Sequence, residues 1–205
     1  MKISLMCTLS LVLVFDAVPS AEADTAKRLS VEFETLITKE DSFQPGVAVL
    51  TAITAKDGAL GGFVFSWAGE TYAEAYGGFT LTFPVGRGHL WTAYGIGIEQ
   101  SDAPDDHSPL RFGGMAILDL PRHLVCARTE IGATQKKFAE PYWYVRYAWK
   151  PNEQFDLGIM AREFAGIGPR IDFWLHRPGL GVWAAPLYDP DTASWRAMLT
   201  FTTGY

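Results

Sequence analysis

Residues 142–150 read Tyr-Trp-Tyr-Val-Arg-Tyr-Ala-Trp-Lys, and this stretch indicates the fold class. Its alternate positions hold two kinds of side chain: Trp143, Val145, Tyr147 and Trp149 on one face, and Tyr142, Tyr144, Arg146 and Lys150 on the other. A period of two is that of a β-strand, whereas an amphipathic helix repeats every 3.6 residues. The stretch therefore predicts a strand with one apolar face and one polar face.

The same alternation recurs along the chain and predicts an all-β fold. In residues 29–37, for example, Leu29, Val31 and Phe33 alternate with Ser30, Glu32 and Glu34. Counting such runs gives about twelve strands, with ten or eight as the alternatives. The twelve predicted strands span residues 28–39, 45–56, 59–69, 72–84, 88–100, 110–121, 123–133, 140–150, 153–164, 168–178, 180–186 and 194–205.

The breaks between these runs predict tight turns. Residues 84–88, 150–153 and 177–179 are short and rich in glycine, proline, asparagine or aspartate, which is ordinary turn chemistry. Short turns join consecutive strands as antiparallel hairpins. The sequence thus predicts an antiparallel sheet that closes into a barrel.

Composition limits the classes of protein that the chain can belong to. The 205 residues are 48% hydrophobic and 20% charged, and the formal net charge is −6. The apolar fraction excludes a disordered chain. The acidic balance argues against a phosphate-binding surface, so no nucleic-acid partner is predicted. The length suits a single domain.

The first 23 residues predict a cleaved signal peptide. Lys2 precedes an almost wholly apolar run over residues 3–15, and Ala21-Glu22-Ala23 has the small-x-small pattern of a cleavage site before Asp24. The apolar run is shorter than the roughly 20 residues that a membrane-spanning helix needs. We therefore expect a mature domain of residues 24–205.

The mature chain would retain one cysteine, Cys126. An internal disulfide is then excluded, and no set of Cys and His residues has the spacing of a zinc site. Cys126 is interpreted as a small apolar residue. We predict no metal and no cofactor.

Three features favour a transmembrane barrel over a soluble, lipocalin-like barrel, the alternative. The predicted strands of about ten to twelve residues suit a tilted membrane-spanning strand. The longer connections, residues 100–109, 133–140 and 186–194, all follow odd-numbered strands, as when long loops gather on one side of a membrane. Tryptophans near strand ends predict aromatic girdles at the membrane interfaces: Trp67, Trp91, Trp143, Trp149 and Trp195.

The C-terminal residues 195–205 read Trp-Arg-Ala-Met-Leu-Thr-Phe-Thr-Thr-Gly-Tyr, with a terminal aromatic and mostly apolar or small residues at alternate positions before it. This ending resembles the signal that the barrel-assembly machinery reads on bacterial outer-membrane β-barrels; Thr203 departs from the apolar series. The resemblance implies location in the bacterial outer membrane, contact with its lipid, and recognition by the assembly machinery through the strand that ends at Tyr205. It implies no narrower family.

A transmembrane barrel turns its polar side chains into the lumen. The predicted lumen-lining residues are Glu32, Glu34, Glu74, Asp119, Arg128, Glu130, Arg146, Asp156, Arg162, Arg170 and Asp172, together with Tyr72, Tyr76, Tyr142 and Tyr144. Charges of both signs suit a narrow channel for passive passage of a small polar or charged solute. They equally suit a plugged structural or surface barrel in which the charges pair across the lumen. The oligomeric state stays open.

A lipid-modifying or proteolytic enzyme is the third hypothesis. Its one candidate cluster is Asp105-Asp106-His107-Ser108 in the loop after the fifth strand. Adjacency in sequence is not triad geometry, so a solvated turn is the simpler interpretation. Gly166 and Gly168 form a Gly-x-Gly motif without a following helix pattern, which predicts a hairpin instead of a phosphate-binding loop.

Overall fold

The computed structural model describes residues 26–38, 44–54, 59–69, 72–101, 110–132, 141–176 and 179–204. These residues form twelve antiparallel strands: β1 (Ala26–Ile37), β2 (Gln44–Thr54), β3 (Leu60–Gly69), β4 (Tyr72–Val85), β5 (Gly88–Ser101), β6 (Leu110–Asp119), β7 (His123–Gly132), β8 (Tyr142–Trp149), β9 (Phe155–Arg162), β10 (Gly166–His176), β11 (Leu180–Asp189) and β12 (Ser194–Gly204). The predicted signal peptide lies outside the described residues. No helix in the described part of the chain is long and apolar enough to cross a membrane.

The strands form one closed barrel in chain order. Each strand pairs with its neighbours in the sequence, and β1 closes the barrel by pairing with β12 from Ser30↔Gly204 to Ile37↔Ala197. Closure leaves no sheet edge whose N–H and C=O groups lack a partner strand. The predicted all-β closed barrel of twelve antiparallel strands is therefore confirmed.

One predicted boundary is wrong by three residues. The strand predicted to end at Pro186 continues to Asp189, and Pro186 pairs in register with Ala197. Proline lacks the N–H of a ladder bond and usually marks a strand edge or end. Here the neighbouring pairs, including Tyr188↔Trp195, carry the ladder past it.

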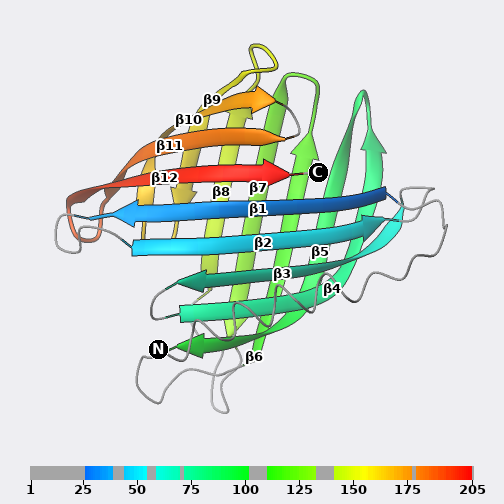
Figure 1. Ribbon diagram of the computed structural model, residues 1–205, viewed down its shortest axis with the longest axis horizontal. Coiled ribbons are helices and arrows are strands. Elements are labelled where there is room, and N and C mark those ends of the chain that lie inside the picture. Colours follow the sequence, from blue (N-terminus) through cyan, green and yellow to red (C-terminus); the bar gives the residue numbers. More distant parts are fainter. Residues whose placement is uncertain are drawn as a thin grey trace.

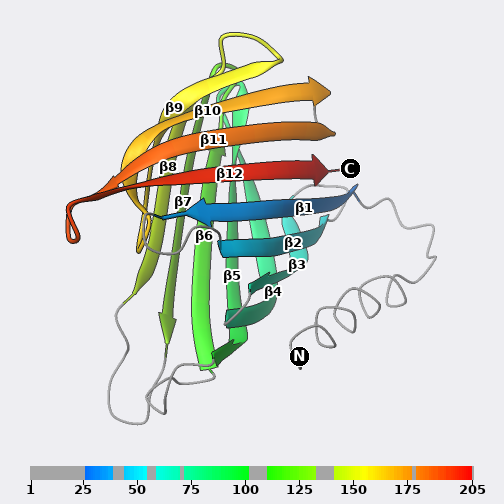
Figure 2. The same cartoon turned by 60° about the vertical axis from the view of Figure 1, so that its left-hand side comes forward.

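The barrel has two walls that cross steeply (Figure 1). In both views β11, β12, β1 and β2 run across the picture, while β6, β7 and β8 run steeply to them on the other side (Figure 2). Inward side chains of the two walls consequently meet in the interior.

From Leu29 onward, the outer face carries no Asp, Glu, Lys or Arg among the strand side chains that the structure describes. Paired residues on neighbouring strands share a face, so the register assigns the faces around the whole barrel. Large apolar side chains dominate the outer one: Ile96, Ile171 and Leu175 are 58%, 54% and 63% exposed. An apolar exterior is the opposite of what a barrel in water presents.

Aromatic rings on the inner face rest on glycines of the neighbouring strands. The Phe63 ring covers Gly95, where an added Cβ would lie 2.8 Å from the ring. The Tyr76 ring covers Gly97 and Gly113, where an added Cβ would lie 2.6 Å and 3.1 Å from it. The glycines thus let two large rings lie close against the backbone of β5 and β6.

We predict that Gly97→Ala destabilises the barrel by about 1–3 kcal/mol, the usual cost of overpacking, because the new methyl group displaces the Tyr76 ring. Gly77→Ala is the matched control, since nothing lies within 4 Å of its added Cβ. Urea unfolding in detergent micelles, followed by tryptophan fluorescence, measures both variants. Equal stability of the two would contradict the packing described.

Candidate functional site

All eleven predicted lumen residues lie on the inner face of the barrel. The register shows this directly in several places: Glu74 lies opposite Trp67, Glu130 opposite Tyr142, and Asp156 opposite Asp172. Five of the eleven are buried, among them Glu130, Asp156 and Asp172 at 2% exposure each, and the other six are half-buried. Glu32 is half-buried on the same face of β1 as Glu34. The interior of the barrel is thus its charged compartment, and whether it lines a passage stays a prediction.

The first group, called the Arg128 cluster, consists of Arg128, Glu74, Glu130 and Tyr76 on β4 and β7. Arg128 donates a hydrogen bond to Glu74 over 2.7 Å and forms an ion pair with Glu130. The Tyr76 hydroxyl donates to Glu130 over 2.7 Å. The Arg128 guanidinium also lies 4.1 Å from the centre of the Phe65 ring on β3. The contacts from β7 to Glu74 and Tyr76 on β4 and to Phe65 on β3 join strands that are not neighbours, so they cross the interior.

The Arg128 cluster continues toward the start of β4. The Tyr72 hydroxyl donates to Glu74 over 2.7 Å and accepts a hydrogen bond from Arg111 over 3.2 Å. Arg111 in turn forms a 2.7 Å ion pair with Glu99. Sequence reasoning missed Arg111 and Glu99 as lumen residues. The alternation along the strands was the available signal. Glu99 lies two residues after Gly97 on β5, and Arg111 lies two residues before Gly113 on β6, so all four positions are on the inner face.

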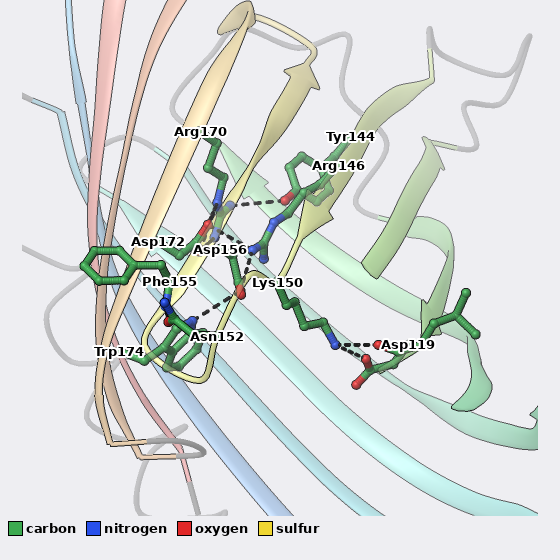
Figure 3. A network of polar contacts seen from close by, with 11 residues as sticks. Asp119, Tyr144, Arg146, Lys150, Asn152, Phe155, Asp156, Arg170, Asp172 and Trp174 are labelled. Carbon is green, nitrogen blue, oxygen red and sulfur yellow. Dashed lines mark hydrogen bonds and ion pairs between the residues drawn. The ribbon is translucent and has the colours of Figure 1, made fainter. Parts of the chain in front are cut away.

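The second group, called the Arg146 cluster, consists of Arg146, Arg170, Asp156 and Asp172 on β8, β9 and β10 (Figure 3). Arg146 lies 2.9 Å from Asp172 and 3.4 Å from Asp156. Arg170 contacts both oxygens of Asp172, at 2.7 Å and 3.1 Å. Asp156 and Asp172 are direct cross-strand partners, a destabilising arrangement for like charges. The positive charges of Arg146 and Arg170 offset the repulsion between these two carboxylates.

Aromatic side chains surround the Arg146 cluster. The Trp174 indole donates to Asp156 over 3.2 Å, and Arg170 donates to the Tyr144 hydroxyl over 3.3 Å. The Arg170 guanidinium lies 3.7 Å from the centre of the Trp183 ring. Stacking on an aromatic face suits the planar, weakly hydrated guanidinium. Arg170 is therefore held on two sides by rings and on a third by a carboxylate.

Another ion pair, outside these two clusters, spans the barrel. Arg162 on β9 lies 2.5 Å from Glu34 on β1, although three strands separate β9 from β1 around the wall. The Tyr142 ring lies between two arginines, with its centre 5.7 Å from Arg162 and 5.7 Å from Arg128. A row of stacked and paired side chains therefore runs from Phe65 through Arg128, Tyr142 and Arg162 to Glu34.

Two further ion pairs lie near the ends of strands. Lys150 pairs with Asp119 and donates to the backbone oxygen of Leu120 over 3.0 Å, as Figure 3 shows in part. Arg196 lies 2.6 Å from Asp189 between β12 and β11. Of these four charged side chains only Asp119 belonged to the predicted lumen set.

An apolar cluster fills part of the interior beside β9, β11 and β12. Its buried members are Met160, Ala165, Trp183, Ala185, Leu187 and Met198, with Leu36 and Tyr144 packed against them. Leu187 and Met198 are 0% and 2% exposed. The interior thus has one apolar part and one charged part.

Three of the five tryptophans predicted for the girdles lie on the outer face of the barrel, and two do not. Trp143, Trp149 and Trp195 lie on the outer face, 41%, 43% and 66% exposed. Trp67 and Trp91 instead lie on the inner face, opposite Glu74 and Thr82. They cannot belong to an outer girdle, and this corrects the prediction for these two residues. Proximity to a turn was a poor guide because it ignores which face a position occupies.

The remaining sequence predictions concern the candidate enzyme cluster, Cys126 and a metal site. Asp105, Asp106, His107 and Ser108 lie outside the described residues. Cys126 is buried on the inner face and unpaired. Within the described ranges, no three His, Cys, Asp or Glu side chains form a group suited to a metal ion.

Comparison with known proteins finds distant barrels. No protein-family model matches the chain, and no curated protein matches it significantly. Pseudomonas aeruginosa OccK5 (OpdH) is 13% identical with a TM-score of 0.44, over 91% of this chain and 69% of that one. The translocator domain of the autotransporter NalP from Neisseria meningitidis is 12% identical with a TM-score of 0.37, over 98% and 95%. A mutant Rh. blastica porin is 8% identical with a TM-score of 0.32, over 88% and 100%.

Proposed function

We propose that the chain is an integral β-barrel of the bacterial outer membrane whose charged interior forms a narrow passage for small polar or charged solutes. One observation carries the proposal: from Leu29 onward, the described strand side chains place every Asp, Glu, Lys and Arg on the inner face and none on the outer face. In water this distribution would expose a very large apolar surface. In lipid it is the stable one, because closure also satisfies every strand edge.

Two expectations from the sequence support the location. The predicted signal peptide would carry the chain across the inner membrane. The C-terminal stretch that resembles the barrel-assembly signal belongs to β12, the strand that closes the barrel against β1. We propose that the assembly machinery recognises this strand.

The charge pattern supports passage over a purely structural role. Buried ion pairs often stabilise a protein no better than well-packed apolar residues of the same volume. The apolar cluster around Leu187 shows that this chain can fill part of its interior with such residues. Facing acidic and basic groups are, in contrast, what selects a charged solute in a pore. The cross-barrel pair of Arg162 and Glu34 would set the narrowest point.

A sealed structural barrel is the second candidate. It is favoured by the low exposure of the inner charges, such as 2% for Asp156 and Asp172, and by the row of contacts that crosses the interior. In that case the ion pairs would only hold the two walls together.

Planar-bilayer conductance separates the two candidates. We expect small, ion-selective steps from the mature chain. Arg162→Gln and Glu34→Gln should both raise the conductance, because each removes the cross-barrel ion pair, and they should shift selectivity toward cations and anions respectively. Arg87→Gln, in the exposed turn between β4 and β5, is the control and should change neither. Insertion without conductance in all variants would favour the sealed barrel, and failure to insert would contradict both candidates.

A further inference from the structure

The interior contains a cavity of about 30 Å³ between β2 and β7. Its walls are mainly apolar: Leu50, Phe63, Phe65, Trp91, Ala93 and Met115. Tyr76, Arg128 and Glu130 of the Arg128 cluster complete the lining. The cavity therefore lies against the charged cluster yet is lined mostly by aromatic and aliphatic groups.

The polar groups beside the cavity are already paired with one another. The Tyr76 hydroxyl donates to Glu130 and Arg128 donates to Glu74, each over 2.7 Å. The face of the Arg128 guanidinium is covered by the Phe65 ring at 4.1 Å. A charged guest would have to break these contacts before it gained any of its own. An uncharged guest leaves them intact.

The aromatic walls of the cavity are fixed in place. Phe63 rests on Gly95, and Tyr76 rests on Gly97 and Gly113, where an added Cβ would lie 2.8 Å, 2.6 Å and 3.1 Å from the ring. Phe65 and Tyr76 also contact each other with ring centres 6.2 Å apart. Rigid walls resist the collapse that would otherwise close a cavity, so the space persists in the folded barrel.

We propose that this cavity is a binding site for small, uncharged, apolar molecules inside the barrel. The site is independent of the proposed passage, because it needs only the walls described and no solute that crosses the membrane. Apolar cavities bind xenon or benzene when large enough, as an engineered cavity of about 150 Å³ does. The present cavity is smaller, so we expect it to admit xenon, and to admit benzene once a wall side chain is shortened.

Methionine-methyl NMR of the full mature barrel in detergent micelles tests the site. Met115 lines the cavity, whereas Met160 and Met198 belong to the apolar cluster on the other side of the interior and serve as internal controls. Under xenon pressure we expect the Met115 methyl resonance to shift with a saturating dependence. The Met160 and Met198 resonances should stay in place.

Two variants sharpen the test. Ala93→Leu should abolish the xenon shift of Met115, because the longer side chain fills the cavity, whereas Ala116→Leu on the outer face of β6 should leave it unchanged. Leu50→Ala should let benzene shift Met115 at concentrations that have no effect on the wild type. If Ala93→Leu does not fold, Leu50→Ala decides the question alone. Parallel shifts of all three methionines, or no Met115 response in both the wild type and Leu50→Ala, would overturn the proposal.

Discussion

Ile171→Arg is expected to lower the stability of the membrane-inserted barrel by about 2–4 kcal/mol, the cost of a basic side chain facing lipid near the bilayer centre. Ile171 lies in the middle of β10 on the outer face and is 54% exposed. If water surrounded the barrel, the same change would cost little, because exposed substitutions usually alter stability by less than about 0.5 kcal/mol. Urea unfolding from lipid vesicles measures the difference.

Phe164→Arg is the matched control for this prediction. Phe164 lies in the turn between β9 and β10 and is 75% exposed, so the new charge would lie at or beyond the membrane surface. The expected cost there is about 0–1 kcal/mol. Equal costs for Ile171→Arg and Phe164→Arg would contradict a lipid-facing outer wall.

Arg128→Met is expected to lower stability by about 3–5 kcal/mol, the cost of leaving a buried charge without its partner. Arg128 contacts two carboxylates, Glu74 and Glu130, whose side chains are 7% and 3% exposed. Methionine retains much of the arginine side chain's apolar length but supplies no charge, so both acidic groups would remain in the interior uncompensated. Urea unfolding in micelles measures the loss.

A triple variant separates loss of charge from loss of packing. Adding Glu74→Gln and Glu130→Gln to Arg128→Met removes the uncompensated charges, and we expect most of the stability to return. Arg87→Met in the exposed turn after β4 should cost under about 0.5 kcal/mol. A triple variant as unstable as Arg128→Met would show that packing, and not charge, holds the Arg128 cluster together.

The sequence predicts the strands and their two faces well because both follow from a local period of two. Leu29, Val31 and Phe33 take the outer face of β1, and Glu32 and Glu34 take the inner one, as alternation alone implies. Knowing that the apolar face lies outside needs the closed barrel, because alternation is the same in a soluble barrel.

The pairing of the inner charges could not be predicted from the sequence. Arg162 and Glu34 are 128 residues apart and meet only because the two walls face each other across a closed interior. Trp67 and Trp91 show the same limit, since their distance from a turn does not reveal their face. For β3, a better signal was the alternation itself, because Trp67 occupies the same face of the strand as Phe65 and Phe63.

The measurement that tests the central claim most directly is a spin-label scan of β12 in lipid vesicles, with Cys126→Ala as the background and single cysteines at residues 197–202. Ala197, Leu199 and Phe201 lie on the outer face, and Met198, Thr200 and Thr202 on the inner face. We predict that collisions with lipid-soluble oxygen rise and fall with a period of two, high at the three outer positions. Outer labels that collide instead with a water-soluble nickel complex would contradict a barrel that faces lipid.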